Sequence, residues 1–290
     1  MGFKQIFRLL KETFQEWQED KSSRLAAALA YYTVFSLAPL LIIVIAIAGA
    51  IFGEEAARGE IVGQIQGLVG KDGATVIEEA IQNADKPRIS SIASIFSLIF
   101  LLIGASGVFA HLQESLNAIW NVKAKPKNGL AGLIRKRVLS FSAVLGIGFL
   151  LLVSLVLSAV ISALSNYLSG LIPGVDFLWQ ILNFVVSFGV ITLLFALMYK
   201  FLPDAKIQWS DVWIGSLITA LLFTIGKFAL GLYLGRGSFG STYGAAGSLV
   251  IILAWVYYSA QILFFGAEFT QVYARKYGSR IVPDEHAIRI

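Results

Sequence analysis

The sequence predicts an all-α integral membrane protein with six transmembrane helices, an N-terminal interfacial amphipathic helix and a helical external cap between spans 1 and 2. Hydrophobic residues make up 57% of the chain and charged residues only 14%, whereas a soluble domain has about 25% charged residues. Six apolar stretches are each long enough for a helix to cross a bilayer, which takes about 20 residues. They are residues 25–52, 89–110, 138–164, 177–199, 212–234 and 243–273.

The third observation is the sorting of positive charge between alternate loops. Seventeen Lys and Arg side chains lie in the N-terminal segment, the second and fourth loops and the C-terminal tail, against five in the other three loops. The positive-inside rule therefore predicts that both termini are cytoplasmic. The net charge of +5 follows from the same sorting beside anionic lipid headgroups. We therefore expect membrane lipids as partners and no nucleic acid.

These stretches divide the chain into three parts. Residues 1–24 form the interfacial helix, residues 25–274 the six-span domain with its external cap at 53–88, and residues 275–290 a cytoplasmic tail. The first apolar run is about twice as long as the h-region of a signal peptide, so we expect an uncleaved first span. The chain has no cysteine, which removes disulfides and thiolate chemistry.

The N-terminal segment has the pattern of an amphipathic helix over residues 3–17. Apolar side chains at i, i+3, i+4 and i+7 cover an arc of about 100°, and Lys4, Arg8 and Lys11 flank it. The arc consists of Phe3, Ile6, Phe7, Leu10, Phe14 and Trp17. This pattern is typical of a helix in the membrane interface, and the alternative is a helix packed on the cytoplasmic ends of the spans.

Proline stands near the middle of the first span. Pro39 removes a backbone donor and clashes with the preceding turn, which predicts a kink that frees the carbonyl of Phe35. Freed backbone groups persist in a membrane only where protein or water satisfies them. A functional role for the kink and a purely architectural one both stay open.

The first external segment, residues 53–88, is acidic, with seven Asp or Glu against four Lys or Arg. Its aliphatic residues keep a helical period that is broken at residues 70–73, Gly-Lys-Asp-Gly. We therefore expect two short amphipathic helices that form a cap over the outer face.

The second span continues beyond the membrane, since Leu112, Leu116, Ile119 and Trp120 keep its helical spacing past His111. Small residues recur along the second and third spans. The third carries Ser142, Gly146, Ser154, Ser158 and Ser162. Close helix packing of the small-xxx-small kind is the usual meaning, and a hydrophilic pathway is the alternative.

Ionisable and polar groups inside the spans are candidates for function. On the last span Tyr257, Gln261, Glu268 and Gln271 share one face at helical spacing, which predicts burial against polar partners. Lys227 lies on span 5 at a different depth from Glu268, so we expect no direct pair. Alternatively, Lys227 reaches the outer interface and Glu268 is solvated from the cytoplasm.

Catalytic motifs are missing from the sequence. The two histidines, His111 and His286, have no ligand partners at motif spacing, and no P-loop, GxSxG or HExxH pattern occurs. We therefore expect no enzymatic activity, no catalytic residues, no metal site, no cofactor and no ATP-driven pumping by this chain alone.

Three segments resemble the YihY/BrkB family of bacterial membrane proteins: residues 26–40 (AAALAYYTVFSLAPL), 116–122 (LNAIWNV) and 243–269 (YGAAGSLVIILAWVYYSAQILFFGAEF). The resemblance covers nearly the whole chain and implies a six-span protein of the bacterial inner membrane. Some members have been named ribonuclease BN, and others are discussed as transporters, including of lipids or lipid-linked envelope material. Family-typical positions here are Tyr31, Tyr32, Pro39, Asn117, Trp120, Tyr257, Gln261, Gly266 and Glu268.

The favoured function is transport of a lipid, a lipid-linked molecule or a small amphiphilic or solute substrate without an ATPase of its own. The candidates for the substrate pathway are Tyr31, Tyr32, Pro39, Asn117, Lys227, Tyr257, Gln261, Glu268 and Gln271. The alternative is a non-transporting scaffold for envelope partners, and a homo-oligomer is compatible with both. A ribonuclease is disfavoured, because the basic cytoplasmic side offers no cluster of carboxylates and histidines for phosphodiester cleavage.

Overall fold

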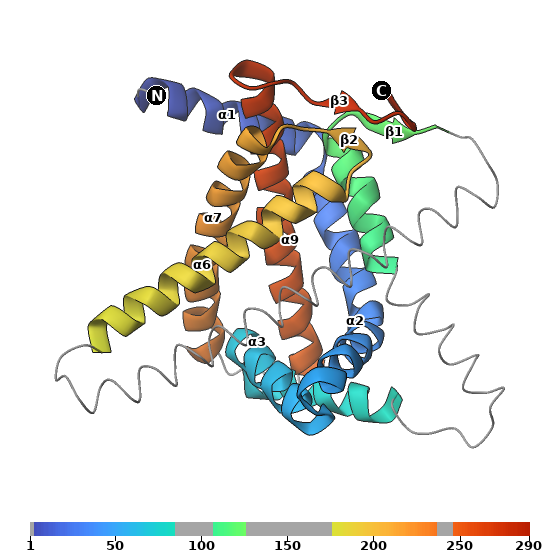
Figure 1. Cartoon of the computed structure of the whole chain (residues 1–290), viewed down its shortest axis with the longest axis vertical. Coiled ribbons are helices and arrows are strands. Elements are labelled where there is room, and N and C mark those ends of the chain that lie inside the picture. Colours follow the sequence, from blue (N-terminus) through green and yellow to red (C-terminus); the bar gives the residue numbers. More distant parts are fainter. Residues whose placement is uncertain (1–2, 85–106, 126–175, 237–245) are drawn as a thin grey trace.

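The computed structural model describes residues 3–84, 107–125, 176–236 and 246–290 (Figure 1). Its helices are α1 (Phe3–Glu19), α2 (Ser22–Phe52), α3 (Glu54–Ala84), α6 (Asp176–Phe201), α7 (Trp209–Arg236) and α9 (Ala246–Lys276), together with a helix over residues 107–119. The helices at the predicted first, fourth, fifth and sixth spans begin and end within a turn of the expected bounds. Most of the predicted second span, and all of the third with its serine stripe, lie outside the described residues.

Three of these helices are long and apolar enough to cross a membrane: Trp179–Phe201, Trp209–Leu230 and Leu249–Lys276. Helix α2 is a fourth candidate, bent by 50° between its parts Ser22–Leu37 and Leu40–Ala46. Pro39 lies at this bend, so the predicted kink is confirmed. Three or four of the six predicted spans are therefore seen within the described residues.

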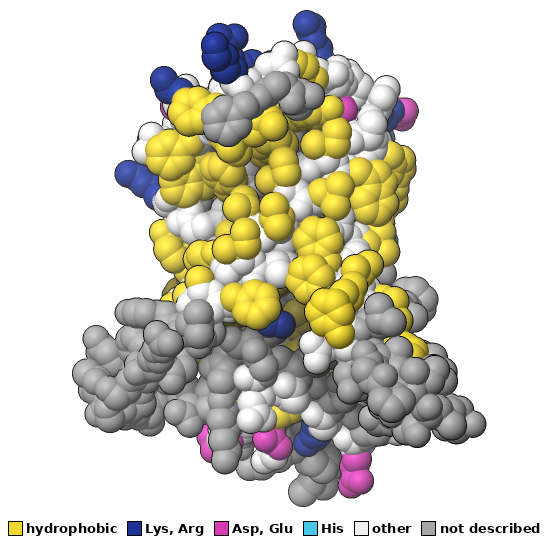
Figure 2. Space-filling view, turned by 90° about the vertical axis from the view of Figure 1, so that its left-hand side faces the viewer, with side chains coloured by type: hydrophobic (Ala, Val, Ile, Leu, Met, Phe, Trp, Pro, Cys, Tyr) yellow, Lys and Arg dark blue, Asp and Glu magenta, His cyan; other side chains and the backbone are white. Residues whose placement is uncertain are grey.

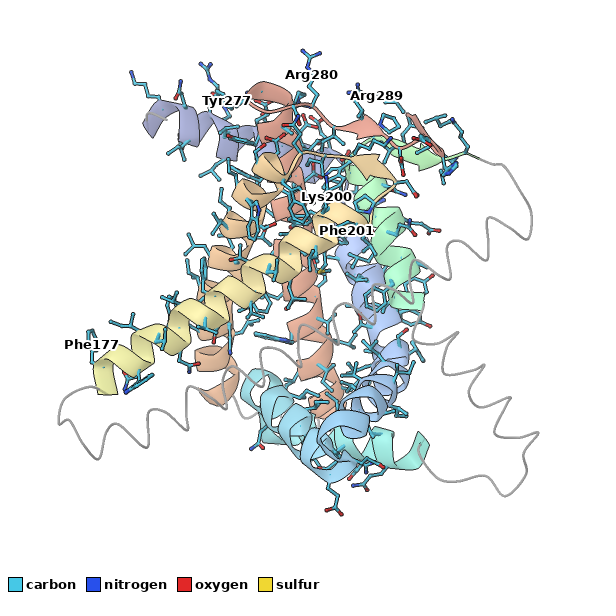
Figure 3. The ribbon with its side chains drawn as sticks, viewed as in Figure 1. Phe177, Lys200, Phe201, Tyr277, Arg280 and Arg289 are labelled. Atoms are coloured by element: carbon cyan, nitrogen blue, oxygen red, sulfur yellow. The ribbon has the colours of Figure 1, made fainter. Side chains whose placement is uncertain are left out.

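Helix α9 is the centre of the bundle, and α1, α2, α3 and α7 all pack against it. Both termini lie at one end of the bundle and α3 lies at the other (Figure 1). Figure 2 shows hydrophobic side chains over the middle of one face and Lys and Arg side chains gathered at the end that holds the termini. The labelled Lys200, Arg280 and Arg289 lie towards this end, whereas Phe177 lies at the far end of the tilted α6 (Figure 3).

Helix α1 packs against the bundle, which is one of the two arrangements that its sequence left open. Leu9 and Thr13 are buried, and Leu9 packs against Phe269 and Val272 of α9. The predicted apolar arc is turned away from α9, and its exposed members are Ile6, Phe7, Leu10 and Phe14. One face of α1 is therefore docked on the bundle, while the aromatic face stays available for the membrane interface.

Helix α3 corrects the prediction of two short helices in the segment 53–88. It is one helix from Glu54 to Ala84 and continues through the Gly-Lys-Asp-Gly sequence at 70–73. Glycine costs about 1 kcal/mol relative to alanine inside a helix, and the packing of Ile77 and Ile81 in one cluster with α2 and Trp255 of α9 offsets such a cost. Helix α3 lies at the end of the bundle opposite the termini, and its role as an external cap stays a prediction.

The C-terminal tail contains β-structure that the all-α prediction missed. Strand β4 (Ala287–Arg289) pairs antiparallel with β1 (Val122–Ala124), and β3 (Val282–Pro283) pairs with β2 (Ala205–Lys206). These strands have two or three residues each, too few for a period-2 pattern to be recognised. The tail therefore pairs with two segments, one after the 107–119 helix and one after α6.

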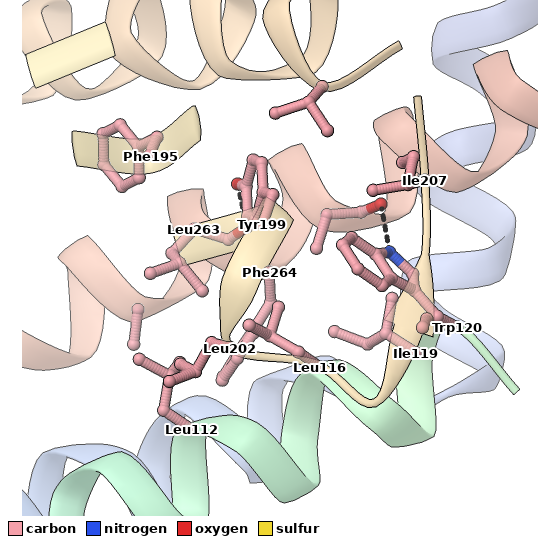
Figure 4. Close-up of a cluster of buried hydrophobic side chains, with 14 of the residues drawn as sticks. Leu112, Leu116, Ile119, Trp120, Phe195, Tyr199, Leu202, Ile207, Leu263 and Phe264 are labelled. Carbon is pink, nitrogen blue, oxygen red and sulfur yellow. Dashed lines mark hydrogen bonds between the residues drawn. The ribbon is translucent and has the colours of Figure 1, made fainter. Parts of the chain in front are cut away.

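The main apolar core lies where α6, α7, α9 and the 107–119 helix meet (Figure 4). Leu116, Ile119 and Trp120 are buried there, which confirms the predicted extension of the second span. The indole N–H of Trp120 donates to the carbonyl of Ala267 at 3.1 Å. The hydroxyl of Tyr199 donates to the carbonyl of Leu263 at 2.7 Å. These bonds satisfy buried donors inside an apolar core and fix the position of α9.

Candidate functional site

Gln261, Glu268 and Gln271 form a row of polar side chains on one face of α9, called here the α9 polar row. Glu268 and Gln271 are buried, and Gln261 is half-buried. Each has a buried side-chain oxygen with no hydrogen-bond partner within the described residues: Oε1 of both glutamines and Oε2 of Glu268. The row extends over about 15 Å of helix. An unsatisfied buried polar group costs about 1–3 kcal/mol, so such a row marks a place for function within a membrane helix.

Glu268 lies in the C-terminal part of the row and its side chain is fully buried. The hydroxyl of Ser22 donates a hydrogen bond of 3.1 Å to Oε1 of Glu268. The carboxyl group of Asp20 lies close enough to interact with the carboxyl group of Glu268. Oδ2 of Asp20 and Oε2 of Glu268 are both buried, and neither has a hydrogen-bond partner within the described residues. Two carboxyl groups thus lie beside each other in the C-terminal part of α9.

The turn between α1 and α2 brings Asp20 and Ser22 to the same carboxyl group. Lys21 between them has a φ of 53°, in the left-handed region that a non-glycine residue seldom adopts. The chain turns from α1 into α2 at this residue, so the end of α1 and the start of α2 both lie beside Glu268. Burial raises the pKa of Asp20, and the negative charge of Glu16 raises it further, against a lowering by its interaction with Glu268.

Ion pairs hold α1 in this position. Arg275 of α9 binds Glu12 at 2.8 Å and Glu16 at 2.7 Å, and Lys276 pairs with the other oxygen of Glu12. Burial alone would raise the pKa of Glu12, but its bonds to Lys276 and Arg275 lower it overall. The cations at the end of α9 are therefore engaged by α1 and leave the pair of Asp20 and Glu268 without a positive partner among the described side chains.

Gly266 allows the helices to approach closely beside the polar row. A Cβ atom at this position would lie 1.8 Å from Oγ1 of Thr219 and 2.6 Å from the hydroxyl of Tyr199. The hydroxyls of Tyr199 and Thr219 are themselves 3.0 Å apart and fully buried. The glycine is therefore part of the contact between α6, α7 and α9.

Asn117, one of the candidates for the substrate pathway, contacts the loop after α6. Its amide nitrogen donates to Oδ2 of Asp204 at 2.8 Å, and its Oδ1 accepts from the backbone N–H of Asp204, also at 2.8 Å. The carbonyl of Asp204 in turn accepts from the backbone N–H of Asp284 in the tail. Asn117 therefore ties the 107–119 helix to the loop after α6 and is not in the α9 polar row.

Tyr31 and Tyr32 lie on α2, exposed, in an aromatic group that includes Phe35 and His111. The rings of Tyr32 and His111 are 4.9 Å apart, as are those of Tyr31 and Phe35. Nε2 of His111 lies 3.2 Å from the carbonyl oxygen of Leu25. No partner for His111 could be recognised from motif spacing, because this contact comes from a helix 86 residues away.

The remaining candidates are separate from the buried row. Tyr257 shares the face of Gln261 by spacing, but it is 38% exposed. Lys227 is exposed on α7, whereas Glu268 is fully buried on α9. Pro39 lies at the bend of α2. The structure therefore brings together Gln261, Glu268 and Gln271 and adds Asp20 and Ser22, which sequence reasoning missed.

The signal that could have identified Asp20 was weak. It is the last acidic residue before the first span, in the sequence Glu-Asp-Lys-Ser-Ser, which looks like an ordinary solvated turn. Within the described ranges, no three His, Asp or Glu side chains come together in a way that could hold a metal ion.

Comparison with known proteins relates the chain to one family. The family model described as Virulence factor BrkB matches residues 13–290. A UPF0761 membrane protein of Verminephrobacter eiseniae is 31% identical over 275 residues, which cover 92% of this chain and 62% of that protein. A UPF0761 membrane protein of Mannheimia succiniciproducens is 27% identical over 280 residues, covering 92% of this chain and 90% of that protein.

The chain thus spans about three fifths of the length of the Verminephrobacter relative and most of the Mannheimia one. No solved structure matches it. The relatives are named as membrane proteins, and the chain has several apolar helices of spanning length. It is therefore a multi-pass membrane protein.

Proposed function

The chain belongs to the family described as Virulence factor BrkB, and on that premise we propose that it transports a lipid, a lipid-linked molecule or another small amphiphilic or solute substrate. It works without an ATPase of its own and catalyses no chemical step. It lies in the bacterial inner membrane with both termini cytoplasmic. The sorting of Lys and Arg along the chain and the position of both termini at one end of the bundle support this orientation.

The observation that carries the proposal is the α9 polar row. Gln261, Glu268 and Gln271 each keep an unsatisfied oxygen inside a bundle whose other buried residues are mostly apolar. A purely structural helix at this position would lose nothing by carrying apolar residues instead, because buried polar groups without partners destabilise a fold. A pathway that offers a few polar contacts in apolar surroundings suits an amphiphilic substrate.

The bend in α2 adds a second element to the proposed pathway. Helix α2 packs along α9, and its axis changes direction by 50° around Pro39. Bent helices in transporters are tolerated where freed backbone groups line a cavity or meet protein partners. We therefore place the pathway between α2 and the polar row, with membrane lipids as the first partners to test.

The test is transport by the full chain reconstituted in liposomes. Lipid scrambling and solute uptake are measured for the wild type, for Glu268→Gln and Gln261→Ala, and for Gln180→Ala. Gln180 is exposed on α6, so the last variant is a matched control for the same substitution outside the polar row. We expect activity above that of empty liposomes, lost in both α9 variants and kept in the control. Wild-type activity no greater than that of empty liposomes over a broad substrate set would overturn the proposal.

A scaffold for envelope partners is the alternative, favoured by the exposed aromatic face of α1 and by the strand pairing of the tail. Crosslinking in intact cells separates the two functions. A stoichiometric partner protein, together with unchanged cellular function of Gln261→Ala, would favour the scaffold.

A further inference from the structure

The junction of α1, α2 and α9 holds two acidic groups that the transport proposal does not require as a pair. Asp20 follows the end of α1 and Glu268 lies in the cytoplasmic part of α9, far apart in sequence. Ser22 donates to Oε1 of Glu268 at 3.1 Å, and the neighbouring carboxyl group of Asp20 interacts with that of Glu268. Oδ2 of Asp20 and Oε2 of Glu268 are both buried without a hydrogen-bond partner within the described residues. The side chain of Glu268 is completely buried.

Two carboxylates in direct contact cannot both be ionised at a modest cost, because like charges at this distance strongly disfavour each other. A hydrogen bond between two carboxyl groups also needs a donor, and only a protonated carboxyl provides one. Two buried carboxyl oxygens that lack other partners therefore favour the binding of one proton between them, and such a pair titrates as a unit.

The surrounding charges favour this arrangement over two separate carboxylates. Glu16 and Glu19 of α1 act on Asp20 and are both negative, and Glu16 also acts on Glu268. Arg275 of α9 is bound to Glu12 and Glu16, and Lys276 to Glu12. On the α2 side, Ser22 is a neutral donor, and Lys21 and Arg24 are exposed.

We propose that Asp20 and Glu268 form a proton-binding site in which one shared proton bridges the two carboxyl groups. The site lies at the junction of the cytoplasmic helix α1 with the membrane-embedded polar row. Loss of the proton leaves two neighbouring carboxylates. Their electrostatic repulsion destabilises the turn between α1 and α2. This assignment does not depend on what the protein transports, or on whether it transports at all.

Replacing either acid by its amide provides a direct test. In Asp20→Asn, or in Glu268→Gln, the new amide N–H donates to the remaining carboxylate, so the hydrogen bond persists without a proton. Glu55→Gln on α3 is a matched control, because Glu55 is exposed and far from the junction. The full chain is purified in detergent, and infrared difference spectra are recorded during a pH titration.

We expect the wild type and Glu55→Gln to keep a carboxylic acid C=O band above the ordinary Asp pKa of about 3.9, with loss of that band at higher pH. We expect the band to be missing in Asp20→Asn and Glu268→Gln. A wild type without such a band, or a band retained in both amide variants, overturns the proposal.

Thermal unfolding over the same pH range is the second measurement. Because the pKa of Asp20 is raised by burial, its contribution to stability is complete below the ordinary pKa and is lost as pH rises through the folded value. The stability of the amide variants should not fall in this way as the pH rises. If Glu268→Gln does not fold, the infrared and unfolding measurements on Asp20→Asn alone test the proposal. If sodium, potassium or calcium removes the band at constant pH with stoichiometric uptake, the pair binds a cation instead and the proposal is wrong.

Discussion

The hydroxyl of Ser22 donates a hydrogen bond to Oε1 of Glu268, although the two residues are 246 positions apart. The first residue of α2 is thereby joined to the one fully buried carboxylate among the described residues of α9. The bond joins α2 to α9 directly after the turn that connects α1 to α2. Changes at the start of the chain can therefore reach the polar row of the last span through one contact.

Gly266→Ala should destabilise the bundle. The added methyl would lie 1.8 Å from Oγ1 of Thr219, and overpacking of this kind costs about 1–3 kcal/mol. Gly189→Ala on α6 is the control, because nothing lies within 4 Å of the place that its added methyl would take. Thermal unfolding in one detergent should show a lower midpoint for Gly266→Ala only. Equal midpoints for the two variants would show that the helices do not pack at Gly266 as described.

Glu12→Gln should loosen α1 from α9. Burial raises the pKa of Glu12, but the bonds to Lys276 and Arg275 outweigh burial and lower it below its ordinary value of 4.5. Its stabilisation is therefore present above that value and is lost as pH falls through the lowered one. The variant should lose about 0.5–1 kcal/mol at neutral pH. Thermal unfolding at neutral and acidic pH measures this, with the exposed Glu79→Gln on α3 as control.

The exposed face of α1 should lie in the membrane. The chain contains no cysteine, so a single introduced cysteine is a unique labelling site. Phe14 and Gln15 are both exposed, and successive residues point about 100° apart on a helix. An environment-sensitive probe on Phe14→Cys should report an apolar environment in liposomes, and a probe on Gln15→Cys a more aqueous one. The same spectrum at both sites would contradict an interfacial position.

The two ends of the bundle should face opposite sides of the membrane. Glu55 on α3 and Arg280 in the tail are both exposed, at opposite ends. A membrane-impermeant maleimide added to spheroplasts should label Glu55→Cys without permeabilisation and Arg280→Cys only after it. The reverse pattern would invert the orientation that we derive from the positive charges.

The sequence could predict the spanning helices and their polar faces, because these features depend on whether each side chain meets lipid or water. Apolar length located the helices α2, α6, α7 and α9, and helical spacing identified Gln261, Glu268 and Gln271 as one face. The bend at Pro39 was also predictable, because proline acts on its own helix. These features follow from short-range chemistry and from the exclusion of water by lipid.

Only the tertiary structure decided which groups face one another. The pairing of Asp20 and Ser22 with Glu268, of Asn117 with Asp204, and of the tail strands with β1 and β2 joins segments that are distant in the chain. Such contacts depend on how the helices pack, and no local period encodes them. The sequence by itself therefore determined a multi-pass helical membrane protein with a polar last span. Packing alone placed a second carboxyl group beside Glu268, because only the folded helices bring the end of α1 to α9.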